Sequence, residues 1–231
     1  MNKNTYFQDW GVVDYQEAWD KQEVLFNELM ETKKAKRTGE IVDYTNHYVV
    51  LVEHPHVYTL GKSGSQNNLL INAIQLKANN ATFVTTNRGG DITYHGPGQI
   101  VGYPILDLEE LGLGLKQYIH MLEDSIINTL AEYNISATRL DGATGVWLDI
   151  DTKNARKICA IGVKSSRFVT MHGFALNVNT QLDYFNYINP CGFIDKGVTS
   201  IQNELGYEID FDECKNKVKA NIEKVFDFKL V

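Results

Sequence analysis

Short apolar runs alternate along this chain with long segments of helical periodicity, and this alternation limits the fold more than any other feature. Residues 15 to 34 and 115 to 133 carry apolar side chains spaced three and four apart, which predicts two helices with one apolar face each. Near the C-terminus, Asp210 to Glu213 form a capping-box-like start, so a third helix is predicted to follow Asp210.

The apolar runs between these helices predict strands. Residues 48 to 53 are rich in β-branched side chains and end at His54-Pro55, which is typical of a buried strand. Similar short runs occupy residues 83–85, 103–106, 146–150, 158–163 and 174–178. Strands interspersed with long helices predict an α/β or α+β fold, in which helices flank a mixed sheet. Because no repeat, low-complexity tract or linker interrupts the chain, we expect one domain over residues 1–231.

Composition excludes several classes of protein. With 231 residues and 43% hydrophobic content, the chain can bury a sizeable core. Its formal net charge of -7 argues against a surface built for nucleic acid or for an anionic membrane. No apolar run approaches the roughly 20 residues that span a bilayer, and the N-terminus resembles neither a signal nor a transit peptide. We therefore expect a cytoplasmic protein, with the basic run 33–37 as a solvated helix end.

The three cysteines have neither the spacing of a disulfide framework nor that of a metal site, so no metal is predicted. Cys159 and Cys214 lie within periodic apolar segments and are expected in the core. Cys191 instead lies between Pro190 and Gly192, outside any periodic element. A loop cysteine of this kind is placed as a nucleophile is placed, since only an accessible thiolate reacts. A turn cysteine without a chemical role is the alternative.

The most unusual stretch is RGGDITYHGPGQ at residues 88–99, where four glycines and a proline surround polar side chains. Glycine lets the backbone approach a ligand closely, while the polar side chains orient it. The stretch matches neither a phosphate-binding loop nor a dinucleotide fingerprint. Two glycine turns around an ordinary strand remain the alternative.

A second polar feature opens the strand-like run at residues 156–164. Period-two alternation places Lys157, Cys159 and Ile161 on one face of that strand. Lys157 is either an exposed strand end or, if it points into an apolar pocket, a usable proton carrier, because desolvation disfavours its charged form. His172, just before another strand, is either a satisfied structural residue or a pocket residue.

Taken together, these segments resemble the lipoyl(octanoyl) transferase family. The resemblance spans about residues 8 to 205 and rests on the runs 51–61, 88–99, 157–163, 172–178 and 189–192, in the family's order. The RGGDITYHGPGQ block is long enough to be highly specific. The tail beyond Leu205 carries no matching motif.

The resemblance implies a fold similar to the biotin and lipoate protein ligases, and a reaction without a cofactor. The implied donor is octanoyl-acyl carrier protein, and the implied acceptors are lysines in the lipoyl domains of 2-oxo acid dehydrogenases and in the glycine cleavage H protein. Cys191 matches the cysteine that carries the acyl thioester, and Lys157 matches its partner. The substrate-contacting segments of the family match Arg88, Gly89, Gly90, Asp91, Ile92, Thr93, Tyr94, His95, Ala160, Ile161, Gly162, Gly173, Phe174 and Ala175.

Two other functions remain open at this stage. An ATP-dependent lipoate or biotin ligase shares the fold but needs no nucleophilic cysteine, and a silent carrier-domain binding module needs neither that cysteine nor its lysine. Because the implied donor is strongly acidic, local positive charge is expected at its docking surface. Candidates are Arg88, Lys153, Arg156, Lys164 and Arg167.

Overall fold

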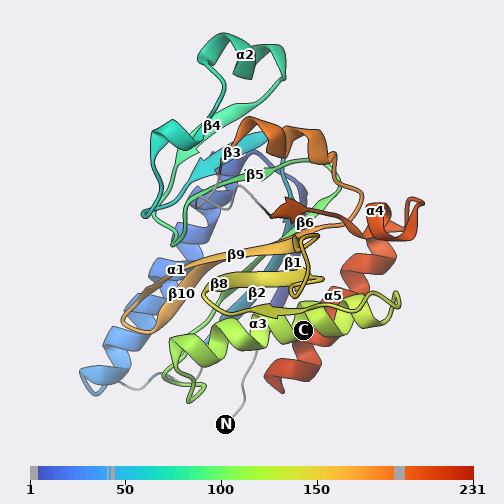
Figure 1. The fold of residues 1–231 in the computed structure, drawn as a ribbon. Coiled ribbons are helices and arrows are strands. Elements are labelled where there is room, and N and C mark those ends of the chain that lie inside the picture. Colours follow the sequence, from blue (N-terminus) through green and yellow to red (C-terminus); the bar gives the residue numbers. More distant parts are fainter. Residues whose placement is uncertain (1–4, 41, 43–44, 190–195) are drawn as a thin grey trace.

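A mixed sheet forms the centre of the molecule, and helices cover both of its faces (Figure 1). The structure is a computed structural model and describes residues 5–40, 42, 45–189 and 196–231. Within these residues, eight strands form the main sheet in the order β1-β2-β6-β10-β9-β8-β7, with β11 paired to β9. The strands are β1 (Thr5–Val12), β2 (His47–Glu53), β6 (Gln99–Ile105), β7 (Thr138–Leu140), β8 (Ala143–Leu148), β9 (Arg156–Ser166), β10 (Val169–Asn177) and β11 (Gly197–Val198).

The two faces of the sheet follow from the alternation of side chains along its buried strands. In β2, Val49 and Leu51 pack with helices α3 (Leu115–Ala131) and α5 (Phe211–Phe226). Val50 and Val52 point to the opposite face, where α1 (Tyr15–Arg37) packs. A strand that is apolar on both faces is typical of a sheet with helices on both sides.

A smaller sheet lies above the main one (Figure 1). In the part of the chain that the structure describes, it contains β4 (Thr82–Thr85), β3 (Val57–Leu60) and β5 (Ile92–His95), in that order. Its tyrosine-rich core also contacts the 3-10 helix η2 (Leu182–Tyr187). The remaining short elements are η1 (Gln66–Asn68), α2 (Ala73–Ala78) and α4 (Ile201–Leu205).

The predicted helices and the mixed α/β architecture are confirmed. Asp210 caps α5 through a hydrogen bond from the Glu213 N–H to its carboxylate, at 2.8 Å. The predicted strands are also present, whereas β1, β3 (Val57–Leu60), β7 and β11 were not predicted. Cys159 and Cys214 are both fully buried and free, as expected. Within the described ranges, no helix is long and apolar enough to cross a bilayer.

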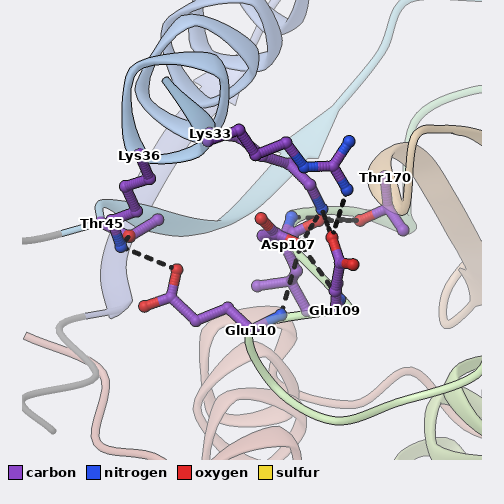
Figure 2. A network of polar contacts seen from close by, with 9 residues as sticks. Lys33, Lys36, Thr45, Asp107, Glu109, Glu110 and Thr170 are labelled. Carbon is purple, nitrogen blue, oxygen red and sulfur yellow. Dashed lines mark hydrogen bonds and ion pairs between the residues drawn. The ribbon is translucent and has the colours of Figure 1, made fainter. Parts of the chain in front are cut away.

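The prediction that residues 33–37 form a solvated helix end was wrong for Lys33, whose side chain is 8% exposed. Its Nζ lies 2.6 Å from Asp107 Oδ1 and 2.7 Å from Glu109 Oε2. Figure 2 shows how the three side chains meet. Lys36 reaches Glu110 and Thr45 in the same network. The basic run therefore pairs with the acidic segment after β6, which a reading of the helix alone does not reveal.

Candidate active site

A cavity of 1150 Å³ lies between the main sheet, the small sheet and residues 88–99, which we call the glycine-rich segment. On β9 it extends from Lys157 to Val163, which is about 20 Å at roughly 3.3 Å per residue. All but one of the described residues that the sequence assigned to substrate or catalysis line it. They are Arg88, Gly89, Gly90, Asp91, Ile92, Thr93, His95, Lys157, Ala160, Ile161, Gly162, Gly173, Phe174 and Ala175.

Tyr94 is the exception, because its side chain lies in the core of the small sheet. Thr93 and His95 line the cavity, whereas Tyr94 is fully buried within the small sheet. Its ring stacks on Tyr184 with centroids 4.9 Å apart, and its hydroxyl forms a 2.7 Å hydrogen bond with His56 Nδ1. Tyr94 therefore supports the wall of the cavity from behind.

The glycine-rich segment packs against β9 through close backbone contacts. The Gly89 N–H donates to the Val163 carbonyl at 2.9 Å, and a Cβ on Gly162 would lie 2.9 Å from the Gly89 carbonyl oxygen. Gly90 has a φ of +84°, which favours glycine. Gly89 and Gly90 thus lie in a bend of the chain at the wall of the cavity.

Arg88 is buried and stabilises this segment through hydrogen bonds of its side chain. It is 7% exposed, and its guanidinium donates to the Thr59 carbonyl at 2.6 Å and to the Gly89 carbonyl at 3.0 Å. These bonds join the glycine-rich segment to β3. The burial of Arg88 removes it from the candidates for a docking surface.

Lys157 enters the cavity because β9 contains a bulge. Val146 of β8 pairs with Cys159 and the next residue, Trp147, pairs with Lys157, so Ile158 is the extra residue. The bulge breaks the alternation that predicted Lys157 and Cys159 on one face: Lys157 lines the cavity and Cys159 lies in the core. Lys157 is half-buried, and its Nζ lies 4.7 Å from the centroid of the Trp147 ring.

The predicted nucleophile Cys191 lies outside the described residues. The described residues that bracket segment 190–195 are Asn189 and Lys196, and both line the cavity. The two residues that flank segment 190–195 therefore lie at the wall of the cavity that Lys157 also lines.

Buried aromatic and imidazole groups form the part of the wall near His172. Burial lowers the pKa of His172 to about 3 and raises the pKa of Tyr15 to about 12. Burial also holds the pKa of His95 well below its usual range, so both imidazoles are neutral at pH 7. The His172 Nε2–H donates to Asn87 Oδ1 at 2.7 Å, and the His172 backbone N–H donates to Gln22 at 2.9 Å.

Among the cavity residues that sequence reasoning missed are Tyr15, Tyr103 and Trp147. Each lies in a regular helix or strand, where an aromatic residue is expected in the core. Only Trp147 offered a signal in the sequence, because it lies in the predicted strand that directly precedes the strand of Lys157 along the chain.

Arg156 is also a poor candidate for the docking surface. Its guanidinium donates to Glu204 at 2.7 Å and also contacts Asp149. The hydrogen bond from Arg156 lowers the pKa of the Glu204 carboxyl. The positive charge of Arg156 is therefore already matched within the molecule.

Residues 14–223 match the family model of the lipoyl protein ligase A/B catalytic domain. The octanoyltransferase of Bacteroides thetaiotaomicron is 55% identical over 225 residues, which cover 97% of this chain and 96% of the relative. Among solved structures, the archaeal bipartite lipoate protein ligase from Thermoplasma acidophilum superposes with a TM-score of 0.71 at 11% identity, covering 100% of this chain and 86% of that one. A biotin protein ligase from Aquifex aeolicus reaches 0.52 at 16% identity, covering 97% and 71%.

These similarities place the chain in the class of lipoyl protein ligase A/B catalytic domains, and the two structures confirm the expected fold. Within that class, the near full-length relative shows that the chain belongs to the lipoyl(octanoyl) transferase family. The protein is therefore an enzyme of the acyltransferase type.

Proposed function

We propose that this protein transfers an octanoyl group from octanoyl-acyl carrier protein to a lysine of a lipoyl domain, through a thioester on Cys191. Its acceptors on this proposal are the lipoyl domains of 2-oxo acid dehydrogenases and the glycine cleavage H protein. The observation that carries the proposal is that one cavity is lined by Lys157 and by Asn189 and Lys196, the residues that flank segment 190–195. Residues 1–231 act as one catalytic domain in the cytoplasm, without a metal or cofactor.

The cavity fits an acyl chain together with the groups that exchange it. Seven carbon–carbon bonds of about 1.5 Å span roughly 9 Å when extended, about half the length of cavity wall along β9. Burial of about seven methylene-sized groups contributes on the order of 5 kcal/mol before ordering costs. The remaining length leaves room for a pantetheine thiol or for an incoming lysine side chain.

The first half-reaction forms the acyl-enzyme. The Cys191 thiolate attacks the carbonyl carbon of the donor thioester, a new carbon–sulfur bond forms, and the pantetheine sulfur leaves. The ammonium of Lys157 supplies the proton that the leaving sulfur takes up. A cation beside the attacking thiol raises the fraction present as thiolate.

The second half-reaction forms the amide. Lys157, now neutral, removes a proton from the acceptor lysine, whose nitrogen attacks the acyl carbon while the Cys191 sulfur leaves. A thioester is higher in energy than an amide, so no nucleotide is consumed. The tetrahedral intermediate of each half-reaction carries an oxyanion, which needs hydrogen-bond donors. The Gly89 N–H is already bonded to the Val163 carbonyl and is a poor candidate for this role.

The test is an ATP-free transfer assay. The purified protein is incubated with octanoyl-acyl carrier protein and an unmodified lipoyl domain, and the masses of all three proteins are measured. We expect one octanoyl group on the lipoyl domain and a transient octanoyl adduct on the enzyme. Cys191→Ala is expected to lose both products, whereas the matched control Cys214→Ala, at a buried cysteine, keeps them.

A parallel reaction supplies free octanoate and ATP in place of the donor protein. Transfer only in that reaction would identify an ATP-dependent ligase and overturn the proposal. Binding of the lipoyl domain without transfer in either reaction would identify a silent binding module.

A further inference from the structure

The ammonium of Lys157 lies over the face of a buried tryptophan. Its Nζ is 4.7 Å from the centroid of Trp147, a residue that is 2% exposed and lines the cavity. A cation within about 6 Å of an aromatic face is attracted by the ring quadrupole, more strongly where water is excluded. Trp147 therefore contacts the Lys157 ammonium, which carries the protons in the proposed reaction.

The ring is fixed in place by its own strand. Trp147 Nε1–H donates to the Ala143 carbonyl at 2.9 Å, within strand β8, which also carries Gly145. Gly145 has a φ of +127°, and a Cβ there would lie 2.6 Å from the Cys159 carbonyl oxygen. The same Cβ would lie 3.5 Å from the side-chain carbons of Lys157. Glycine at this position thus lets β8 lie close to the β9 backbone at Cys159, with the Lys157 side chain in van der Waals range.

Helix α3 anchors this strand from behind. The Gly145 N–H donates to Glu123 Oε1 at 3.0 Å, and Arg139 Nε donates to Glu123 Oε2 at 2.8 Å. Glu123 is 4% exposed, so its two oxygens are committed to these donors. The buried carboxylate holds the conformation that presents the Trp147 face to Lys157.

We propose that Trp147 is a positioning residue, whose indole face holds the Lys157 ammonium in the cavity at the place where the acyl group is exchanged. The inference rests on the proposed function, in which Lys157 gives and takes protons. An aromatic face suits that task because it attracts an ammonium but cannot take its proton. A carboxylate in the same place would hold the ammonium more tightly and would compete with the thiolate.

The test replaces Trp147 by tryptophans carrying one to four fluorine atoms, incorporated at that position alone. Fluorination weakens the ring quadrupole in steps while the ring keeps nearly the same size. Trp10 is the matched control, since Lys21 lies 5.6 Å from its ring centroid but Trp10 does not line the cavity. The readouts are kcat for octanoyl transfer and, without substrate, the fraction of Lys157 acetylated by trace acetic anhydride at pH 8.

We expect kcat to fall at each step, by about threefold to thirtyfold over the whole series, and the labelling of Lys157 to rise. Labelling rises because the ammonium loses a partner that favours its charged form. The Trp10 series is expected to change neither readout. The unfolding temperature reports separately on any structural damage.

Labelling of Lys157 that stays constant through the Trp147 series would overturn the inference. So would labelling that rises while kcat stays constant, because Trp147 would then hold a lysine that the reaction does not use. If the unsubstituted protein fails to transfer octanoyl at all, the proposed function fails, and the labelling series still decides whether the ring holds the ammonium.

Discussion

Replacing Lys33 by methionine tests the buried ion network of Figure 2. Lys33 and Asp107 are 8% and 6% exposed, so the substitution leaves a carboxylate inside the protein without its cation. Removing one partner of a buried pair costs about 3–5 kcal/mol. The N–H groups of Glu109 and Glu110 still donate to Asp107, at 3.0 and 3.4 Å, so we expect the lower limit of about 3 kcal/mol.

In a chain of this size that loss lowers the unfolding temperature by about 6–12 °C, measured by calorimetry. The neighbouring Lys34 provides the control, because its side chain is 66% exposed and lies 3.7 Å from the exposed Glu31. Lys34→Met should cost less than about 1 kcal/mol. Octanoyl transfer at 25 °C should be unchanged in both variants, since neither lysine lines the cavity.

A double variant separates the pair from the packing around it. Lys33→Met combined with Asp107→Asn should cost clearly less than the sum of the two single changes, because the second change removes the stranded charge. Equal unfolding temperatures for Lys33→Met and Lys34→Met would refute the reasoning, as would strict additivity in the double variant.

Three further outcomes are expected. Gly173→Ala should cost about 1–3 kcal/mol and weaken acyl transfer, because its Cβ would lie 2.1 Å from the Gly102 carbonyl oxygen; unchanged calorimetry and kinetics would contradict this. Burial lowers the pKa of His54 from 6.5 to about 4, so unfolded chains bind its proton first and stability falls between pH 6.5 and 4. His54→Gln should reduce that acid loss by up to about 3 kcal/mol in denaturant titrations. Burial raises the pKa of Cys214 to about 12, so iodoacetamide at pH 8 should label Cys191 and spare Cys214 in the folded protein.

The fold was largely predictable because its elements are long and strongly periodic. The helices α1, α3 and α5 carry apolar residues at helical spacing, and β2 and β10 consist mostly of buried residues. β1 escaped prediction because its alternation is weak and only Thr5 among its residues is fully buried. Its partners, β2 and the C-terminal Leu230, are distant in sequence.

The site was predictable where a motif marks it and unpredictable where tertiary contacts decide. The glycines of residues 88–99 signal close backbone approach, and the structure places two of them, Gly89 and Gly90, at the cavity. The bulge at Ile158 depends on the pairing of β9 with β8, so strand alternation alone misplaced Lys157 relative to Cys159. The burial of Lys33 likewise depends on acidic residues more than seventy positions away.

The most direct test of the account is peptide mapping of the acyl-enzyme. The protein is mixed with octanoyl-acyl carrier protein without acceptor, quenched in acid and digested, and the position of the octanoyl group is read by mass spectrometry. The account predicts the adduct on Cys191, with slower formation in Lys157→Ala and none on Cys159 or Cys214. An adduct that persists unchanged in Cys191→Ala would contradict it.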